Sequence, residues 1–170
     1  MTATILFAQP YDISAKGFYF RDMEEFDDKV ANLVNDYGAP VEEFEIQFID
    51  GETINYELAN AIDLSQGNFV QFFTLVNDLE EWKKIHLMIA VRECGYDAKT
   101  AIDNINALDI TIYEESSYAD LARQFVGEGL YGEIPETLQF YIDYEAIGRD
   151  LAVDYGSTRK NGRSFIYRCG

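Results

Sequence analysis

The sequence predicts an α+β fold in three small units packed end to end, and three observations lead to this prediction. Residues 43–49 alternate between apolar and polar side chains, as in a strand with one buried face. Residues 68–105 repeat apolar side chains at helical spacing, and a strand pattern returns after Leu108. No linker rich in Pro, Ser or Gly interrupts the chain, so we expect little independent motion between units. The expected units are 1–60 (α+β), 61–106 (helical bundle) and 107–170 (α+β).

The charge of the chain is strongly acidic and is spread over all three units. Of 170 residues, 31 are Asp or Glu and 13 are Lys or Arg, a formal net charge of −18. The units hold 13, 7 and 11 of these acids, so a disordered acidic tail does not explain them. The 48% hydrophobic content, with 12 Phe and 12 Tyr, is typical of a folded chain.

Basic residues gather only near the C-terminal end. Four of them lie within the last twelve positions, namely Arg159, Lys160, Arg163 and Arg168. Elsewhere no cluster of Lys and Arg could bind a phosphate backbone, so direct nucleic-acid binding is not expected.

The N-terminal unit is expected to contain three or four strands and one helix. Two short apolar runs, Ile5–Ala8 and Phe18–Phe20, are separated by a turn region and predict adjacent strands. Asp50-Gly51 is a tight hairpin signal, which would lead from the strand at 43–49 into a partner strand at 53–56.

Five acidic residues crowd the first two turns of the helix expected in this unit. Asp22 with Glu25 is an Asp version of a capping box, and Gly38 is a stop signal. A helix dipole stabilises each nearby acid by about 0.3–1 kcal/mol, but only within the first turn. Five acids exceed what the dipole can use, so we favour a partner-facing patch over a purely local role. The patch would comprise Asp22, Glu24, Glu25, Asp27 and Asp28.

The middle unit is expected to be a bundle of three helices. Asn68 can cap the first, a run from Trp82 to Cys94 predicts the second, and Asp97 can cap the third.

The C-terminal unit should begin with a strand at 110–113 and a helix capped by Ser116 or Ser117. Asn161-Gly162 then predicts a terminal hairpin.

Between these elements, Pro135 suits the first turn of one long helix that is expected to reach about Leu151. At about 100° per residue, this helix would bury Phe140, Tyr144 and Ile147. Glu136, Asp143 and Asp150 would lie along one exposed strip. That strip is either a solvated helix face or part of a partner-binding surface.

The residues do not indicate an enzyme, a metal site or a cofactor. The single histidine, His86, lies in an apolar helical run with no nucleophile motif nearby, so a structural role is favoured. No phosphate loop, dinucleotide fingerprint or metal-ligand spacing occurs. Abundant carboxylates leave an undetected hydrolase as an alternative.

Cys94 and Cys169 form neither a disulfide framework nor a metal-ligand spacing, so reduced thiols in the cytoplasm are expected. The start of the chain has no basic n-region, and no apolar run reaches membrane-spanning length, so neither export nor membrane insertion is indicated.

The C-terminal sequence resembles a known family. The run GEIPETLQFYIDYEAIGRDL, followed by AVDYGS, the Asn161-Gly162 turn and SFIYRC, is similar to the C-terminal part of ArdA antirestriction proteins. These are small acidic proteins of mobile genetic elements that imitate duplex DNA and occupy the DNA-binding groove of type I restriction-modification enzymes. The resemblance is strongest over 117–168 and is limited to helix content over 58–106. The basic C-terminal end departs from it.

The resemblance implies an elongated, non-enzymatic DNA mimic that forms a homodimer, acts in the cytoplasm and needs no cofactor. It also places the family's antirestriction motif at 129–145. The partner-binding acids expected in this unit are Glu114, Glu115, Asp120, Glu128, Glu133, Glu136, Asp143, Glu145 and Asp150. An alternative is an acidic scaffold or decoy module that binds basic DNA-binding proteins without DNA-like geometry.

Overall fold

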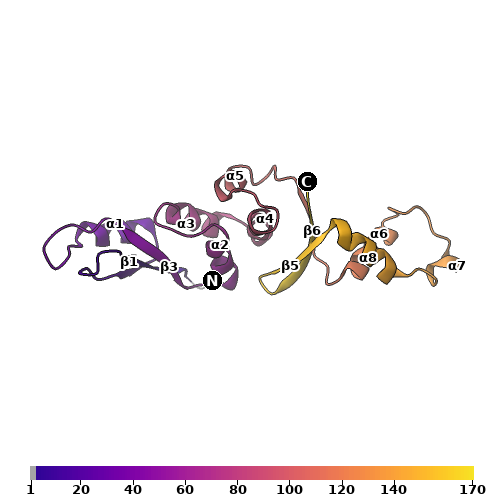
Figure 1. Cartoon of the computed structure of the whole chain (residues 1–170), viewed down its shortest axis with the longest axis horizontal. Coiled ribbons are helices and arrows are strands. Elements are labelled where there is room, and N and C mark those ends of the chain that lie inside the picture. Colours follow the sequence, from indigo (N-terminus) through magenta and orange to yellow (C-terminus); the bar gives the residue numbers. More distant parts are fainter. Residues whose placement is uncertain (1–2) are drawn as a thin grey trace.

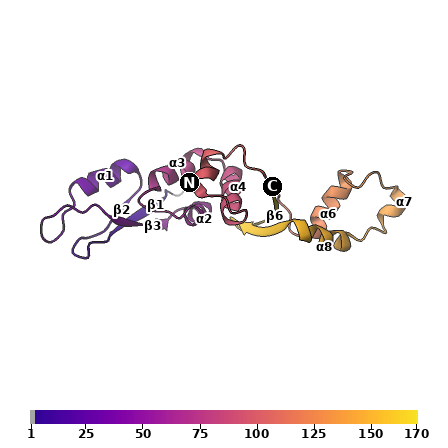
Figure 2. The ribbon, with the colours of Figure 1, turned by 45° about the horizontal axis from the view of Figure 1, so that its top comes forward.

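The computed structural model describes residues 3–170 and shows an elongated body (Figures 1 and 2). The chain starts in one half of the body and runs to the far end, and its last two strands return to the middle. Helices and strands are both present, which confirms the α+β class. The strands are β1 (Ile5–Pro10), β2 (Phe18–Phe20), β3 (Phe44–Asp50), β4 (Ile110–Tyr113), β5 (Gly156–Lys160) and β6 (Arg163–Cys169). The helices are α1 (Met23–Ala31), α2 (Thr53–Ala61), α3 (Phe69–Asp78), α4 (Glu81–Arg92), α5 (Ala98–Asp103), α6 (Tyr118–Gly127), α7 (Glu136–Gln139) and α8 (Tyr144–Asp154).

The N-terminal sheet has the strand order β2-β1-β3, with antiparallel neighbours. In the central strand, Leu6 and Ala8 are fully buried and lie opposite Phe48 and Ile46 of β3. Side chains alternate between the faces of a strand, so these apolar residues share one face that packs on the helices. The strand predicted from the alternation at 43–49 is confirmed.

The partner strand predicted at 53–56 is wrong, because these residues begin helix α2. Ile54 and Leu58 are buried four residues apart, so the apolar side chains follow helical spacing. Asp50-Gly51 connects a strand to this helix instead of closing a hairpin. Gly51 has φ +149°, and a Cβ there would lie 2.9 Å from the ring of Phe48, so the tight turn needs glycine.

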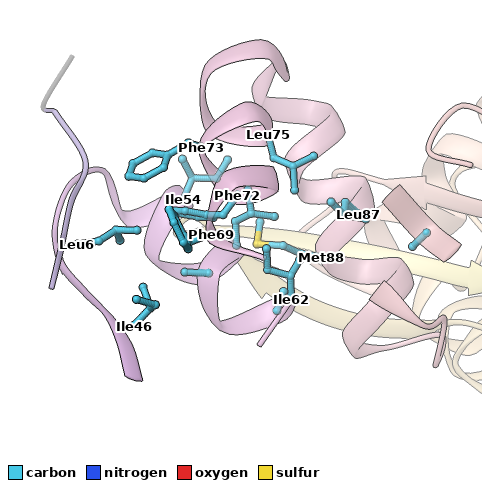
Figure 3. Close-up of a cluster of buried hydrophobic side chains, with 14 of the residues drawn as sticks. Leu6, Ile46, Ile54, Ile62, Phe69, Phe72, Phe73, Leu75, Leu87 and Met88 are labelled. Atoms are coloured by element: carbon cyan, nitrogen blue, oxygen red, sulfur yellow. The ribbon is translucent and has the colours of Figure 1, made fainter. Parts of the chain in front are cut away.

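One hydrophobic core extends from the N-terminal sheet through the central helices (Figure 3). Phe72 and Leu87 are fully buried in it, and Leu6 joins it from the sheet. The three helices predicted for the middle of the chain are confirmed as α3, α4 and α5, and the Asp97 side chain caps α5 by accepting from the Thr100 amide. Residues of the first two expected units share this core, and the unit boundaries at 60/61 and 106/107 stay a prediction.

The second sheet has the order β4-β6-β5 and lies between two cores. Phe165 of β6 joins the large core, whereas its neighbour Ile166 packs with Leu121 and Phe125 of α6 in a smaller cluster. The predicted hairpin is confirmed at Asn161-Gly162, where both residues have positive φ. We define residues 114–155 as the C-terminal arm. The sheet therefore packs against the central helices through one face and against the C-terminal arm through the other.

The single helix predicted over 135–151 is wrong. The chain forms the single-turn helix α7 and then a second helix, α8, which Asp143 caps by accepting from the Ala146 amide at 2.9 Å. A new cap interrupts the helical hydrogen-bond ladder, so the two helices need not share a face. Phe140 is 95% exposed and Tyr141 84%, so the expected burial of Phe140 is also wrong.

The expectation of two reduced cysteines is wrong as well. Cys94 and Cys169 form a disulfide with a Cα–Cα distance of 5.5 Å. Their separation of 75 residues gives no local sequence signal. They meet because Phe165 and Tyr167 of β6 pack with the core of the central helices, and the strand ends at the residue that bonds to Cys94, just beyond α4.

Candidate protein-binding surface

Acidic side chains lie at the surface along the whole described body. No Asp or Glu within residues 3–170 is buried. Ion pairs within this range involve six of the 31 acidic side chains. Most carboxylates therefore have no basic side chain in direct contact and face the solvent.

Most of the acids that are only partly exposed have partners within the chain. Glu25 lies 2.6 Å from Lys29 and accepts from the Arg21 amide at 2.9 Å, and the bond from Lys29 chiefly holds the pKa of this carboxyl below its usual range. Asp12 accepts from Asn35 at 2.7 Å, and this bond chiefly lowers its pKa. These carboxylates stabilise loops and helix ends.

The predicted N-terminal patch divides into two groups on α1. Asp22 accepts from the Glu25 amide at 2.8 Å, which confirms a capping arrangement. Glu24, Asp27 and Asp28 are exposed and form no ion pair within the described residues. Their spacing of three and four residues places them on one side of the helix, opposite the buried Phe26. This side is a continuous acidic face.

Several of the predicted C-terminal acids are occupied within the chain. Glu114 pairs with Arg163 at 3.1 Å, and Asp120 pairs with Arg123 at 2.9 Å. Glu128 accepts from the Gln124 side chain at 2.8 Å.

Other predicted acids remain open to a partner. Glu115 is partly exposed, and four more side chains are exposed without an ion pair within residues 3–170. These four are Glu133, Glu136, Glu145 and Asp150. The predicted strip along one helix does not exist, because Glu136 lies in α7, Asp143 is the cap of α8 and Asp150 lies within α8. The structure places the α1 face and these acids at opposite ends of the body (Figure 1).

The C-terminal arm carries a group of exposed apolar side chains that the sequence pattern did not predict. Besides Phe140 and Tyr141, Leu130 is 60% exposed, Leu138 54% and Tyr131 53%. Gly129, Gly132 and Pro135 stand within seven positions of the same segment. Such a density of turn residues was the available signal that this stretch would not form one buried helix.

A search of residues 3–170 for metal-ligand clusters and for membrane-spanning helices found neither. No group of three or more His, Cys, Asp and Glu side chains within residues 3–170 could hold a metal ion. None of the helices formed by these residues has the length and apolarity to cross a membrane. His86 is partly buried, and burial lowers its pKa and so favours the neutral ring.

An open hollow of about 490 Å³ lies between the N-terminal sheet and the central helices, beside Lys84. The ammonium group of Lys84 donates to Asn55 at 3.1 Å and to the Val76 carbonyl at 2.8 Å. These neutral acceptors hold the buried lysine in place, which indicates a structural role. Burial lowers its pKa.

The fold and the surface define an acidic α+β protein whose long, structured surface suits a positively charged partner. The family model described as antirestriction protein (ArdA) matches residues 13–164 of the chain. The chain therefore belongs to the ArdA family of antirestriction proteins. A search of curated proteins found no match.

Proposed function

We propose that this antirestriction protein imitates duplex DNA and blocks the DNA-binding groove of type I restriction-modification enzymes. The observation that supports this proposal is the run of exposed carboxylates, most of them without an ion-pair partner, along an elongated body. A groove that binds DNA presents Lys and Arg to phosphates, and it would accept fixed carboxylates in their place. In this proposal the protein acts in the cytoplasm and has no catalytic role.

To match the charge density of duplex DNA, the protein must use acids from several helices and strands. Duplex DNA carries one charge per roughly 1.7 Å of axis. Acids seven residues apart on one helix would be about 10.5 Å apart, so no single helix matches that density. Acids of α1, of the central helices and of the C-terminal arm together cover the length of the body.

We further propose that the protein is a homodimer joined through the exposed apolar side chains of the C-terminal arm. Phe140, Tyr141 and Leu138 lie at the end of the body opposite α1. Exposed apolar groups of this kind mark interaction sites. A two-fold axis at this end would leave both α1 faces at the outer ends and would double the acidic length. Such symmetry suits a DNA site with two half-sites.

The experiment that tests the proposed function measures both activities of a purified type I enzyme. DNA cleavage and DNA methylation should fall together as the protein is added, and added DNA should relieve the inhibition by competition. Inhibition that excess DNA cannot relieve would overturn the assignment to the DNA groove. Binding to unrelated basic proteins with equal affinity would instead support the acidic decoy.

A variant of the α1 face links this inhibition to named residues. Glu24→Gln, Asp27→Asn and Asp28→Asn together should weaken inhibition and leave the melting temperature equal or higher, because mutual repulsion falls. The matched control is Glu24→Asp, Asp27→Glu and Asp28→Glu, which keeps the charge and should keep the inhibition. Equal inhibition by the two variants would remove the α1 face from the proposed surface.

A further inference from the structure

The basic end of the chain contrasts with the rest of the molecule. Residues 157–170 hold four basic side chains and no acidic one. A free basic surface would weaken an acidic mimic, yet each of these side chains has a partner within the chain. Arg159 donates to the Gly162 carbonyl at 2.8 Å, and the guanidinium of Arg168 lies 5.7 Å from the ring centre of Tyr155.

Among the ion pairs within residues 3–170, the pair of Lys160 with Glu93 is the most buried. The Lys160 ammonium lies 2.8 Å from a carboxylate oxygen of Glu93, and the two side chains are only 15% and 24% exposed. Thr158 donates to the same oxygen at 2.9 Å. Burial tends to raise the pKa of Glu93, but the bonds from Lys160 and Thr158 outweigh it and the pKa is lowered. The pair thus joins the β5–β6 hairpin to the C-terminal end of α4.

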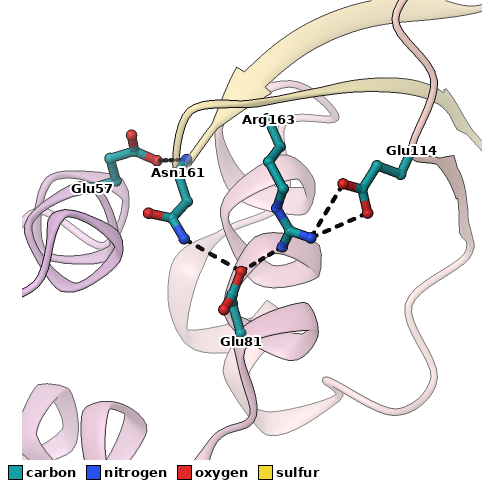
Figure 4. A network of polar contacts seen from close by, with 5 residues as sticks. All are labelled: Glu57, Glu81, Glu114, Asn161 and Arg163. Atoms are coloured by element: carbon teal, nitrogen blue, oxygen red, sulfur yellow. Dashed lines mark hydrogen bonds and ion pairs between the residues drawn. The ribbon is translucent and has the colours of Figure 1, made fainter. Parts of the chain in front are cut away.

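Arg163 bridges two segments on the other side of the hairpin turn (Figure 4). Its guanidinium contacts Glu81, the first residue of α4, and lies 3.1 Å from Glu114, which follows β4. Asn161 adds a bond from its backbone amide to Glu57 of α2 at 2.8 Å and one from its side chain to Glu81 at 3.3 Å. The turn is therefore fixed to both α2 and α4.

The disulfide fixes the other end of the same strand. Cys169 of β6 bonds to Cys94, two residues beyond α4, so strand and helix are joined near both of their ends. A strand of this length and the stretch from Glu81 to Cys94 each span about 20 Å, so the two can be joined at both ends.

We propose that the β5–β6 hairpin is a clasp that sets the position of the C-terminal arm relative to the central helices. Its ion pairs and the Cys94–Cys169 disulfide hold it together, and reduction of the disulfide makes it sensitive to salt. The effect on inhibition rests on the proposed function, because a DNA groove requires a fixed distance between the two acidic ends.

The two kinds of bond have different strengths. A surface ion pair changes an equilibrium by at most about fivefold and is screened by salt. The disulfide keeps the partners close together, so that their ion pairs form again each time they break.

Reduction of the disulfide needs a dithiol. One of its thiolates attacks a sulfur of the exposed Cys169 or its partner, and its second thiol closes the dithiol's own disulfide. Cys94 and Cys169 leave as two thiols, and the dithiol loses the two electrons that they gain.

Distances measured within one labelled chain test the clasp without any restriction enzyme. Donor and acceptor dyes are attached through non-natural amino acids at the exposed positions Asn32 and Val153, and the labelled chain is diluted with excess unlabelled chain. The oxidised protein should give one narrow distance distribution at all salt concentrations. With dithiothreitol, the distribution should stay narrow at low salt and broaden at high salt. A narrow distribution in the reduced protein at high salt would overturn the clasp, because packing alone would then hold the arm.

Variants distinguish the loss of the clasp from a general loss of stability. Arg163→Gln should broaden the distribution of the reduced protein already at low salt, whereas Arg163→Lys, which keeps the charge beside Glu81 and Glu114, should leave it narrow. Arg123→Gln is the matched control, because its ion pair with Asp120 is local to α6. Equal effects of Arg163→Gln and Arg123→Gln would count against the clasp.

Inhibition is measured on the same preparations. Arg163→Gln removes two surface ion pairs, each of which corresponds to a factor of up to about five, so the reduced variant should lose up to about 25-fold in potency. A broader distance distribution without any loss of potency would overturn the link between the clasp and inhibition. It would still support the clasp as the feature that sets the position of the arm. A wild-type protein that inhibits nothing would refute the proposed function, and the distance measurements would still decide the clasp.

Discussion

Gly148 of α8 lies directly against Ala119 of α6, and a Cβ on the glycine would be 2.9 Å from the Ala119 amide nitrogen and 3.0 Å from the Tyr118 carbonyl carbon. Both neighbours are backbone atoms, so neither can move aside without shifting a helix. The two helices of the C-terminal arm thus pack at a distance that only glycine permits. The contact leaves no room for even one methyl group.

Gly148→Ala should accordingly lower the free energy of unfolding by about 1–3 kcal/mol, because the added methyl overpacks the contact. The matched control is Gly127→Ala in α6, where nothing lies within 4 Å of the added Cβ. That change should be neutral or stabilise by up to about 1 kcal/mol. Chemical denaturation of both variants measures the difference, and an equal effect would show that α8 can move away from α6 freely.

Phe140→Ala should leave thermal stability nearly unchanged, because this side chain is 95% exposed. Surface changes usually stay within about 0.5 kcal/mol. The same variant should reduce self-association if the apolar side chains of the arm form the dimer contact, which sedimentation velocity measures. Phe125→Ala is the buried counterpart and should cost about 3–5 kcal/mol. A large loss of stability in Phe140→Ala would show that the segment packs against its own chain.

The acid dependence of stability should carry a contribution from Glu93. Its pKa in the folded protein lies below the ordinary glutamate value of 4.5, so the folded state favours the charged form. This contribution is fully present above that value and is lost as the pH falls through the folded pKa. Protonation of the many other acids relieves repulsion and acts in the opposite direction. The quantity to measure is therefore the difference between wild type and Glu93→Gln.

That difference should be largest near neutral pH and should shrink on acidification. A difference independent of pH would mean that Glu93 is not charged within the clasp.

The affinity for the restriction enzyme should fall steeply as salt rises, as the affinity of DNA does, because carboxylates would replace phosphates. Glu136→Gln, Glu145→Gln and Asp150→Asn together should make the slope of log affinity against log salt shallower. Asp143 is left intact in this variant, because its side chain caps α8. Isothermal calorimetry over a salt series measures the slope. The same slope in wild type and variant would exclude these three acids from the contact surface.

Local sequence signals predicted much of the fold. The alternation at 43–49 gave β3 correctly, Ser117 and Asp97 cap the helices expected of them, and Asn161-Gly162 forms the hairpin turn. Each of these features depends on neighbours within a few residues. Their physical cause is therefore visible in a short stretch of chain.

The errors arose where distant parts of the chain decide the structure. Asp50-Gly51 suits a hairpin, but the buried positions beyond it pack as a helix against the central core. The pairing of Cys94 with Cys169 depends on where β6 docks. At the candidate surface, composition predicted exposed acids. Only the structure shows that Asp22 caps α1, whereas Glu24 is free to contact a partner.

The place of Phe165 in the large core also affects how the chain folds during synthesis. The other buried members of that core lie at or before Ala101, so they leave the ribosome well ahead of β6. At the usual elongation rate, the interval between Ala101 and Phe165 lasts roughly 3–13 s. During that time the nascent protein has a nearly complete core, one side of which is still exposed to solvent. Chaperone binding and aggregation compete with folding in this window, and a ribosome that pauses between these two positions would lengthen it.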